Sequence, residues 1–112
     1  LHGAVAYYFP PQNSSNSIVV FYHKGDDLAE PLFLLFHEAG HVVQNSRPGK
    51  KEFADKMNLS NGREKMEFET DAWNEGEILF QKFLEQENLD FDLLQRFKEY
   101  AARAVESYSS TE

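Results

Sequence analysis

Two histidines and a glutamate near the middle of the chain have the types and spacing of a metal site. His37 and His41 are four residues apart, so on a helix their side chains lie one above the other. Their imidazole nitrogens can hold one metal ion, and Glu38 lies on an adjoining face. A zinc ion held in this way lowers the pKa of a bound water to about 7, and a neighbouring carboxylate can accept the proton. The pattern H-E-x-x-H therefore supplies two ligands and a general base, but it lacks a third protein ligand.

A group of acidic residues further along the chain can supply that ligand. Glu67 and Asp71 are four residues apart, so both project from one face near a helix start, where the helix dipole favours negative charge. We predict that Glu67 reaches the ion and that Asp71 orients a ligating imidazole through its free N–H. Glu69 competes for the role of ligand, but its partner four residues on is Trp73 rather than an acid. Two imidazoles, one carboxylate and an open fourth position are typical of a catalytic zinc site.

These two segments resemble the signature of the gluzincin metallopeptidases, in which H-E-x-x-H on one helix is followed by E-x-x-x-D on a later helix. Residues 34–43, LLFHEAGHVV, are similar to the active-site helix of the ImmA/IrrE group and of the minimal soluble gluzincins, or minigluzincins. Residues 67–73, EFETDAW, are similar to the second-helix segment of the same groups. The resemblance covers about residues 17–80 and leaves the last part of the chain unplaced.

The resemblance implies a particular site and reaction. It implies that His37, His41 and Glu67 bind one Zn²⁺ ion per chain, that Glu38 is the general base, and that Asp71 supports a ligand. It also implies hydrolysis of peptide bonds by a zinc-bound water.

The chain departs from the family where an oxyanion-stabilising residue is often found. No histidine follows His41, and the only later phenols, Tyr100 and Tyr108, have helical spacing that indicates packing.

The elements that must position these residues follow from local patterns. Residues 4–9 and 18–23 are rich in β-branched and aromatic residues and predict two strands. The polar loop between them favours an antiparallel hairpin. A helix is expected from about Pro31, which suits a first helical turn, to Asn45. Gly40 within this helix costs about 1 kcal/mol relative to Ala, which indicates either a close approach of another element or simple tolerance.

Further helices should follow in the second half of the chain. Residues 50–60 are ambiguous and could form a short helix. Asn61 and Glu64 are three apart and predict a capping box for a long helix over residues 63–88. A last helix should span residues 90–108. The order of strands followed by helices predicts an α+β domain, with a hairpin or small antiparallel sheet packed on the active-site helix, a second metal-ligand helix and a C-terminal helix.

The second predicted strand has a functional interpretation as well as a structural one. An edge strand beside the zinc helix could pair with an extended substrate along Val19, Val20, Phe21 and Tyr22. The alternative is a core strand that buries one of its faces, and both interpretations can hold together.

Composition bounds the remaining possibilities. The chain has 112 residues, 41% of them hydrophobic and 14% aromatic, which predicts a single domain over residues 1–112. The absence of cysteine excludes thiol nucleophiles and cysteine-based zinc sites.

The net charge of −8 falls wholly in residues 64–112, which argues against nucleic-acid binding because that requires a basic face. With no signal peptide and no apolar run near the ~20 residues of a membrane span, a cytoplasmic location is favoured.

The sequence thus predicts a zinc metallopeptidase that acts on peptide or protein substrates. The alternative is a latent or non-catalytic zinc-binding module with a regulatory or interaction role. A third possibility is a helical interaction domain without a metal. The sequence leaves the oligomeric state open.

Overall fold

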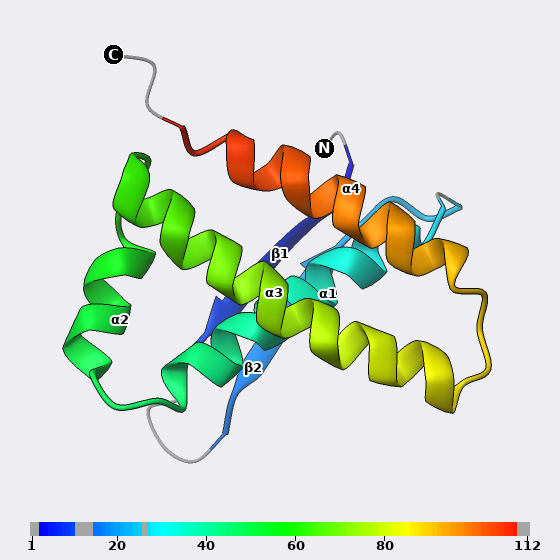
Figure 1. The fold of residues 1–112 in the computed structure, drawn as a ribbon, viewed down its shortest axis with the longest axis horizontal. Coiled ribbons are helices and arrows are strands. Elements are labelled where there is room, and N and C mark those ends of the chain that lie inside the picture. The colour runs from blue at the N-terminus through cyan, green and yellow to red at the C-terminus, as the bar shows by residue number, and fades with distance from the viewer. Residues whose placement is uncertain (1–2, 11–14, 26, 110–112) are drawn as a thin grey trace.

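The computed structural model describes residues 3–10, 15–25 and 27–109, which form two strands and four helices (Figure 1). The elements are β1 (Val5–Phe9), β2 (Ser17–Phe21), α1 (Ala29–Asn45), α2 (Lys50–Met57), α3 (Arg63–Gln86) and α4 (Asp92–Glu106). The predicted α+β class is confirmed. In the described part of the chain, no helix combines the length and the apolar character that a membrane span requires.

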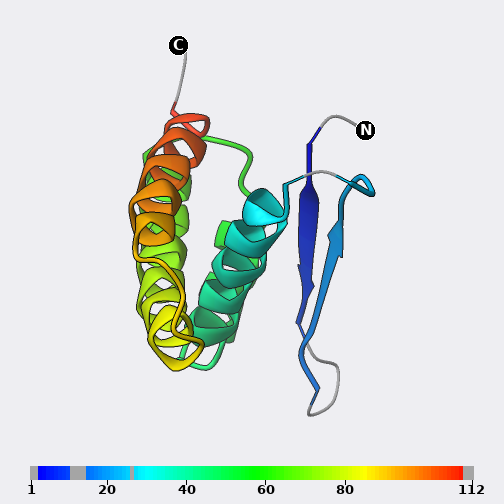
Figure 2. The same cartoon turned by 90° about the vertical axis from the view of Figure 1, so that its right-hand side faces the viewer.

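The elements form three layers (Figure 2). The β-hairpin lies on one side of α1, and α3 and α4 lie on the other side. The two strands are antiparallel, with Val5 opposite Phe21 and Phe9 opposite Ser17. Helix α1 is therefore the central element, covered on both sides.

The hairpin is fastened to the end of α1 by a buried tyrosine. The Tyr8 hydroxyl donates to Asn16 Oδ1 at 2.7 Å and accepts from Asn45 Nδ2 at 3.0 Å. Strand β2 ends at Phe21, so Tyr22 lies beyond the strand in which it was predicted. Asn45 is the last residue of α1, and this contact therefore links the hairpin to the end of the helix that carries the two histidines.

One helix start and one helix cap differ from the prediction. Helix α1 begins at Ala29, whose N–H donates to Asp27 Oδ1 at 3.0 Å; Pro31 then lies within the first turn, where its missing N–H costs no helical bond. The predicted capping box at Asn61 is wrong, because the N-cap of α3 is Gly62, with φ of 99° and no side-chain cap. Helix α2 shows that the ambiguous segment is helical over Lys50–Met57.

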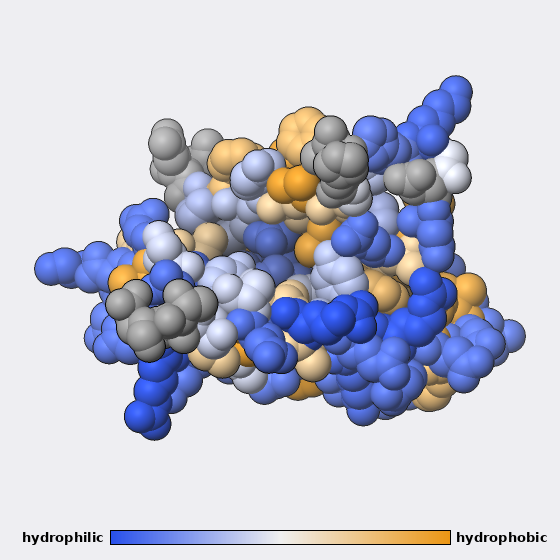
Figure 3. All heavy atoms as spheres, turned by 90° about the horizontal axis from the view of Figure 1, so that it is seen from above, coloured by the Kyte–Doolittle hydropathy of each residue, from blue (hydrophilic) through white to orange (hydrophobic). Residues whose placement is uncertain are grey.

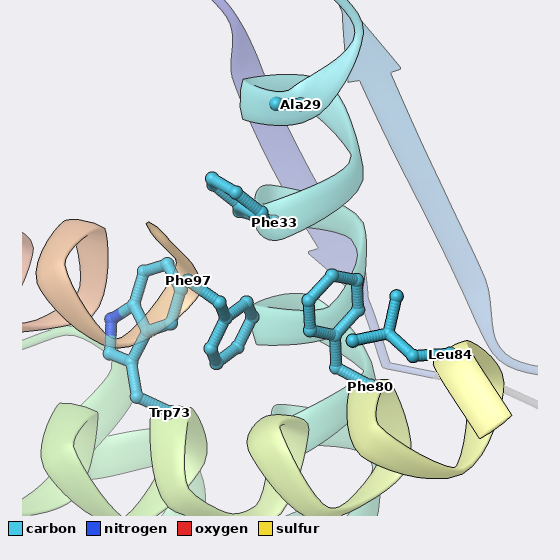
Figure 4. Close-up of a cluster of buried hydrophobic side chains, with 6 residues drawn as sticks. All are labelled: Ala29, Phe33, Trp73, Phe80, Leu84 and Phe97. Atoms are coloured by element: carbon cyan, nitrogen blue, oxygen red, sulfur yellow. The ribbon is translucent and has the colours of Figure 1, made fainter. Parts of the chain in front are cut away.

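An aromatic core joins α1, α3 and α4 (Figure 4). Its buried members are Ala29, Phe33, Trp73, Phe80, Leu84 and Phe97. The Phe33 ring meets Phe80 and Phe97 edge-on, with centroids 5.8 and 5.6 Å apart, a favoured aromatic geometry. Phe97 is fully buried, so α4 completes this core.

One face of the molecule shows how polar and apolar residues are distributed on its surface. The face seen from above is mostly hydrophilic, with hydrophobic residues gathered in smaller areas between the polar ones (Figure 3).

Helices α1 and α3 cross in close contact at two glycines. A Cβ added to Gly40 would overlap the carbonyl oxygen of Ala72, and one added to Gly76 would overlap the carbonyl oxygen of Phe36. The close approach predicted from Gly40 is confirmed. The two backbones touch directly, so residues on the facing sides of α1 and α3 are brought within bonding distance of each other.

We predict that Gly76→Ala destabilises the protein by about 3 kcal/mol, because overpacking outweighs the ~1 kcal/mol gain in helix propensity. The measurement is the free energy of unfolding in urea. The control is Asn74→Ala on the exposed side of the same helix, which should leave that free energy within ~0.5 kcal/mol. A Gly76→Ala protein as stable as the original would show that the crossing can relax.

Candidate metal centre

The two motif histidines meet a carboxylate of α3. His37 and His41 are 6% and 2% exposed, and both lie on the side of α1 that faces α3. Glu69 Oε1 is 2.9 Å from His37 Nε2 and 3.1 Å from His41 Nε2. Glu69 itself is 2% exposed. One carboxylate oxygen therefore sits against both imidazole nitrogens in a buried site.

The structure brings Glu69 to the two histidines, rather than the predicted ligand Glu67. The Glu67 side chain is 68% exposed and pairs with Arg63 Nε at 3.4 Å. Two residues along a helix turn a side chain by about 200°, so Glu67 and Glu69 face opposite ways. Glu69 shares its face with Trp73 and Gly76, the buried residues that follow it by four and seven positions. The helical spacing of Glu69, Trp73 and Gly76 is therefore the sequence pattern that identifies Glu69. Glu67 was preferred because an acid, Asp71, follows it by four residues.

Gln44, which the sequence analysis did not single out, fixes the tautomer of His41. Its Nε2 donates to the Phe68 carbonyl oxygen at 2.8 Å and to Asp71 Oδ2 at 2.9 Å. Both partners are acceptors, so the amide can point only its oxygen at His41 Nδ1, 2.7 Å away. That nitrogen must then carry a proton and donate it. The neutral His41 ring is left with its Nε2 lone pair facing Glu69.

Asp71 does not contact an imidazole directly, in contrast to the prediction. It bonds to Gln44, and Gln44 bonds to His41. Its carboxylate is 42% exposed and also accepts from Arg47 at 2.7 Å. Asp71 therefore orients the histidine through the amide rather than by a direct contact.

The close contact between His41 Nε2 and the Glu69 carboxylate requires a positive charge between them. A lone pair on Nε2 and a carboxylate oxygen at 3.1 Å repel each other unless a positive charge lies between them. A proton on Nε2 or a metal ion can supply that charge. Donors bound tetrahedrally at 2.0–2.1 Å are roughly 3.3 Å apart, close to the two distances found here. The site is thus compatible with a metal ion that draws one ligand from each histidine and one from Glu69.

His37 is held as the neutral ring that a metal requires. Its ring stacks on Trp73 with centroids 4.1 Å apart. Burial lowers the pKa of His37, although the hydrogen bond to Glu69 opposes this shift. Its Nδ1 is buried and has no hydrogen-bond partner among the described residues, so this histidine is oriented by stacking, whereas Gln44 orients His41.

Glu38 is a second buried carboxylate beside the histidines. It is 8% exposed, and its Oε2 lies 3.9 Å from His37 Nε2. Burial raises the pKa of Glu38 to about 7. For Glu69, burial acts in the same direction, but the hydrogen bonds from His37 and His41 outweigh it and hold its pKa far below the usual range. The two carboxylates thus differ: Glu69 is fixed as an anion, and Glu38 lies near the point at which it can exchange a proton.

The donor atoms are close enough to share an ion. Ligand atoms of His37, Glu38 and His41 all lie within 4.8 Å of one another. Glu38 therefore competes with Glu69 for the third position, but only Glu69 is in contact with both imidazoles. Glu69 is therefore better placed than Glu38 to share an ion with both histidines.

The two later phenols occupy different surroundings. The Tyr100 hydroxyl donates to Glu30 Oε2 at 2.7 Å and so ties α4 to the start of α1. Tyr108 lies beside Lys65, whose Nζ is 5.5 Å from its ring centroid. Burial first, and then the charges of Glu69 and Glu38, raise the pKa of Tyr108 to about 12. Of the two, Tyr108 is the phenol near the site.

The predicted substrate strand lies in another layer from Glu69. Val19 and Phe21 are exposed, Val20 is half-buried, and Tyr22 is 50% exposed just past the strand. The hairpin covers the side of α1 away from α3 (Figure 2). Pairing of this strand with a substrate stays a prediction.

We predict that the proton of neutral His41 resides on Nδ1 in metal-free protein. Long-range ¹H–¹⁵N NMR of the imidazole rings measures this directly. Gln44→Leu should abolish the preference, whereas Asp71→Ala should preserve it because the Phe68 carbonyl still holds the amide. A His41 ring in the unmodified protein that carries a proton on Nε2 and none on Nδ1 would contradict the assigned hydrogen-bond network.

Comparison with known proteins leaves the site to be judged on its own geometry. No protein-family model, curated protein or solved structure was found to match this chain.

Proposed function

We propose that the chain is a zinc-dependent metallopeptidase in which His37, His41 and Glu69 hold one zinc ion. The observation that carries this proposal is the His41 ring: Gln44 fixes a proton on Nδ1, and Nε2 lies 3.1 Å from a Glu69 carboxylate oxygen, a contact that requires a proton or a metal ion between the two atoms. Two nitrogens and one oxygen on converging side chains form the His₂Glu donor set of catalytic zinc sites. The hydrogen bond from Nδ1 to an amide oxygen is the outer support that such ligands need.

The chain's own residues then divide the work of hydrolysis. A bound zinc ion supplies a Lewis acid, which polarises a carbonyl and makes water acidic enough to ionise near neutral pH. Glu38 lies beside the histidines without contacting both of them, so it can take the proton from water and pass it to the leaving amine. Gln44 and Trp73 hold the two rings in place.

A latent or non-catalytic zinc-binding module is the second candidate, and burial favours it. His41 is covered on one side by the rings of Phe53 and Phe68, whose centroids are 6.3 and 5.1 Å from its own and 5.5 Å from each other. Both rings line a surface hollow together with Gln44, so they stand between that hollow and the histidine. Access to His41 from this hollow requires these rings to move, and a module that never opens would bind zinc without turnover.

The assignment of the third ligand is tested by a matched pair of variants, Glu69→Gln and Glu67→Gln. We expect Glu69→Gln to weaken zinc binding by at least ~100-fold, because an amide oxygen is a much poorer ligand than a carboxylate. Glu67→Gln should change it less than ~2-fold, because that side chain faces solvent with Arg63. Competition with a chromophoric chelator gives both affinities. The reverse order would reinstate Glu67.

Catalysis is tested by Glu38→Gln. This variant should keep about one zinc per chain and lose peptide hydrolysis by ~10²–10⁴-fold, the usual contribution of a general base. Metal analysis and cleavage of a peptide library provide the two measurements. Zinc binding by the unmodified protein with no cleavage of any library member would reject the peptidase in favour of the latent module. Failure to bind zinc would reject both.

A further inference from the structure

A buried lysine lies directly behind the proposed zinc ligand. Lys65 is 5% exposed, and its Nζ is 3.0 Å from Glu69 Oε2. The same ammonium group donates to the carbonyl oxygens of Lys56 at 3.2 Å and Met57 at 3.0 Å. Three acceptors thus match the three N–H donors of a lysine.

The position of this ammonium group is set by two helices. Lys65 is one turn before Glu69 on α3, so their side chains lie on one face. Lys56 and Met57 are the last two residues of α2, and the negative end of a helix dipole favours a cation there. The Phe68 ring lies 5.4 Å from Nζ and limits its movement. The lysine is therefore held in place and does not sample many positions.

Lys65 divides the two oxygens of Glu69 between different partners. Oε2 faces the ammonium group, and Oε1 faces the two imidazole nitrogens. A carboxylate without such a partner can offer both of its oxygens to one ion. With Lys65 in place, only Oε1 is free for a ligand bond.

Lys65 also changes the charge of the site. Two neutral imidazoles and the Glu69 carboxylate carry one negative charge, and the buried ammonium group cancels it. A divalent cation therefore meets one unit of negative charge less than it would without Lys65, with Glu38 as the other acid beside the histidines. This weakens its binding and leaves more of its charge available to polarise water or a carbonyl.

We propose that Lys65 is a positioning residue that restricts Glu69 to one ligand oxygen, lowers the affinity for the metal and keeps a coordination position open. The proposal rests on the metal centre proposed above and adds to it a residue that acts through Glu69. The alternative is that Lys65 only ties α2 to α3, with no influence on the ion.

Cobalt(II) is the probe that separates these two roles, because its visible absorption weakens when an additional ligand joins a tetrahedral site. In Lys65→Met, we expect Co²⁺ to bind at least ~10-fold more tightly, which corresponds to ~1.4 kcal/mol, and its visible absorption to fall as Oε2 becomes a ligand. Lys82→Met removes the same charge from an exposed position on α3 and should alter neither quantity. Circular dichroism establishes that each variant is folded.

A second, milder variant repeats the test in case Lys65→Met does not fold. Lys65→Gln keeps a hydrogen-bond donor but removes the charge, and it should also bind Co²⁺ more tightly than the unmodified protein. Unchanged or weaker affinity together with an unchanged spectrum in the folded variants would overturn the positioning role while leaving the metal centre intact. An unmodified protein that binds no Co²⁺ or Zn²⁺ would overturn the metal centre itself, and this inference with it.

Discussion

The direct contact between the backbones of α1 and α3 is the constraint on which the rest of the structure depends. Gly40 and Gly76 remove the side chains that would otherwise separate the two helices. At this spacing Glu69 reaches both histidines, and Gln44 reaches the Phe68 carbonyl across the same interface. The glycines weaken each helix on its own, so the arrangement is one in which local stability is given up for a close tertiary contact.

The sequence predicted the parts of the fold that follow from local patterns. The hairpin, the helix of the H-E-x-x-H motif and the long helix after it all depend on apolar periodicity and breakers near at hand. The capping of helices was less well predicted. The Asp27 side chain accepts from the first residue of α1, and Gly62 rather than Asn61 precedes α3, because helix propensity does not specify which residue caps a helix.

The sequence predicted the two histidines of the site, but it did not predict the observed roles of Glu69, Gln44 and Lys65. Glu69 could have been found by placing the acids on the same helical stripe as Trp73 and Gly76, since Glu67 falls on the opposite side of that helix. Gln44 could not have been found in this way. Lys65 precedes Glu69 by four residues and so lies on the same stripe, but its other contacts could not have been found from the sequence. Their roles depend on carbonyl oxygens of Phe68, Lys56 and Met57, and any residue type offers a carbonyl, so nothing in the letters marks these partners.

The crossing has a consequence for how stability and ion binding are related. The donor groups come from α1 and α3, which are 28 residues apart in sequence at His41 and Glu69, and the unfolded chain does not hold them together. An ion bound by both helices therefore adds its binding free energy to that of folding, as RT ln(1 + [L]/Kd). Removal of such an ion would loosen the contact between the two helices at Glu69 and the histidines, where Trp73 of the aromatic core stacks on His37. The interface between α1 and α3 would then be stabilised by two interactions: the glycine contact, which is part of the chain, and the ion, which comes from solution.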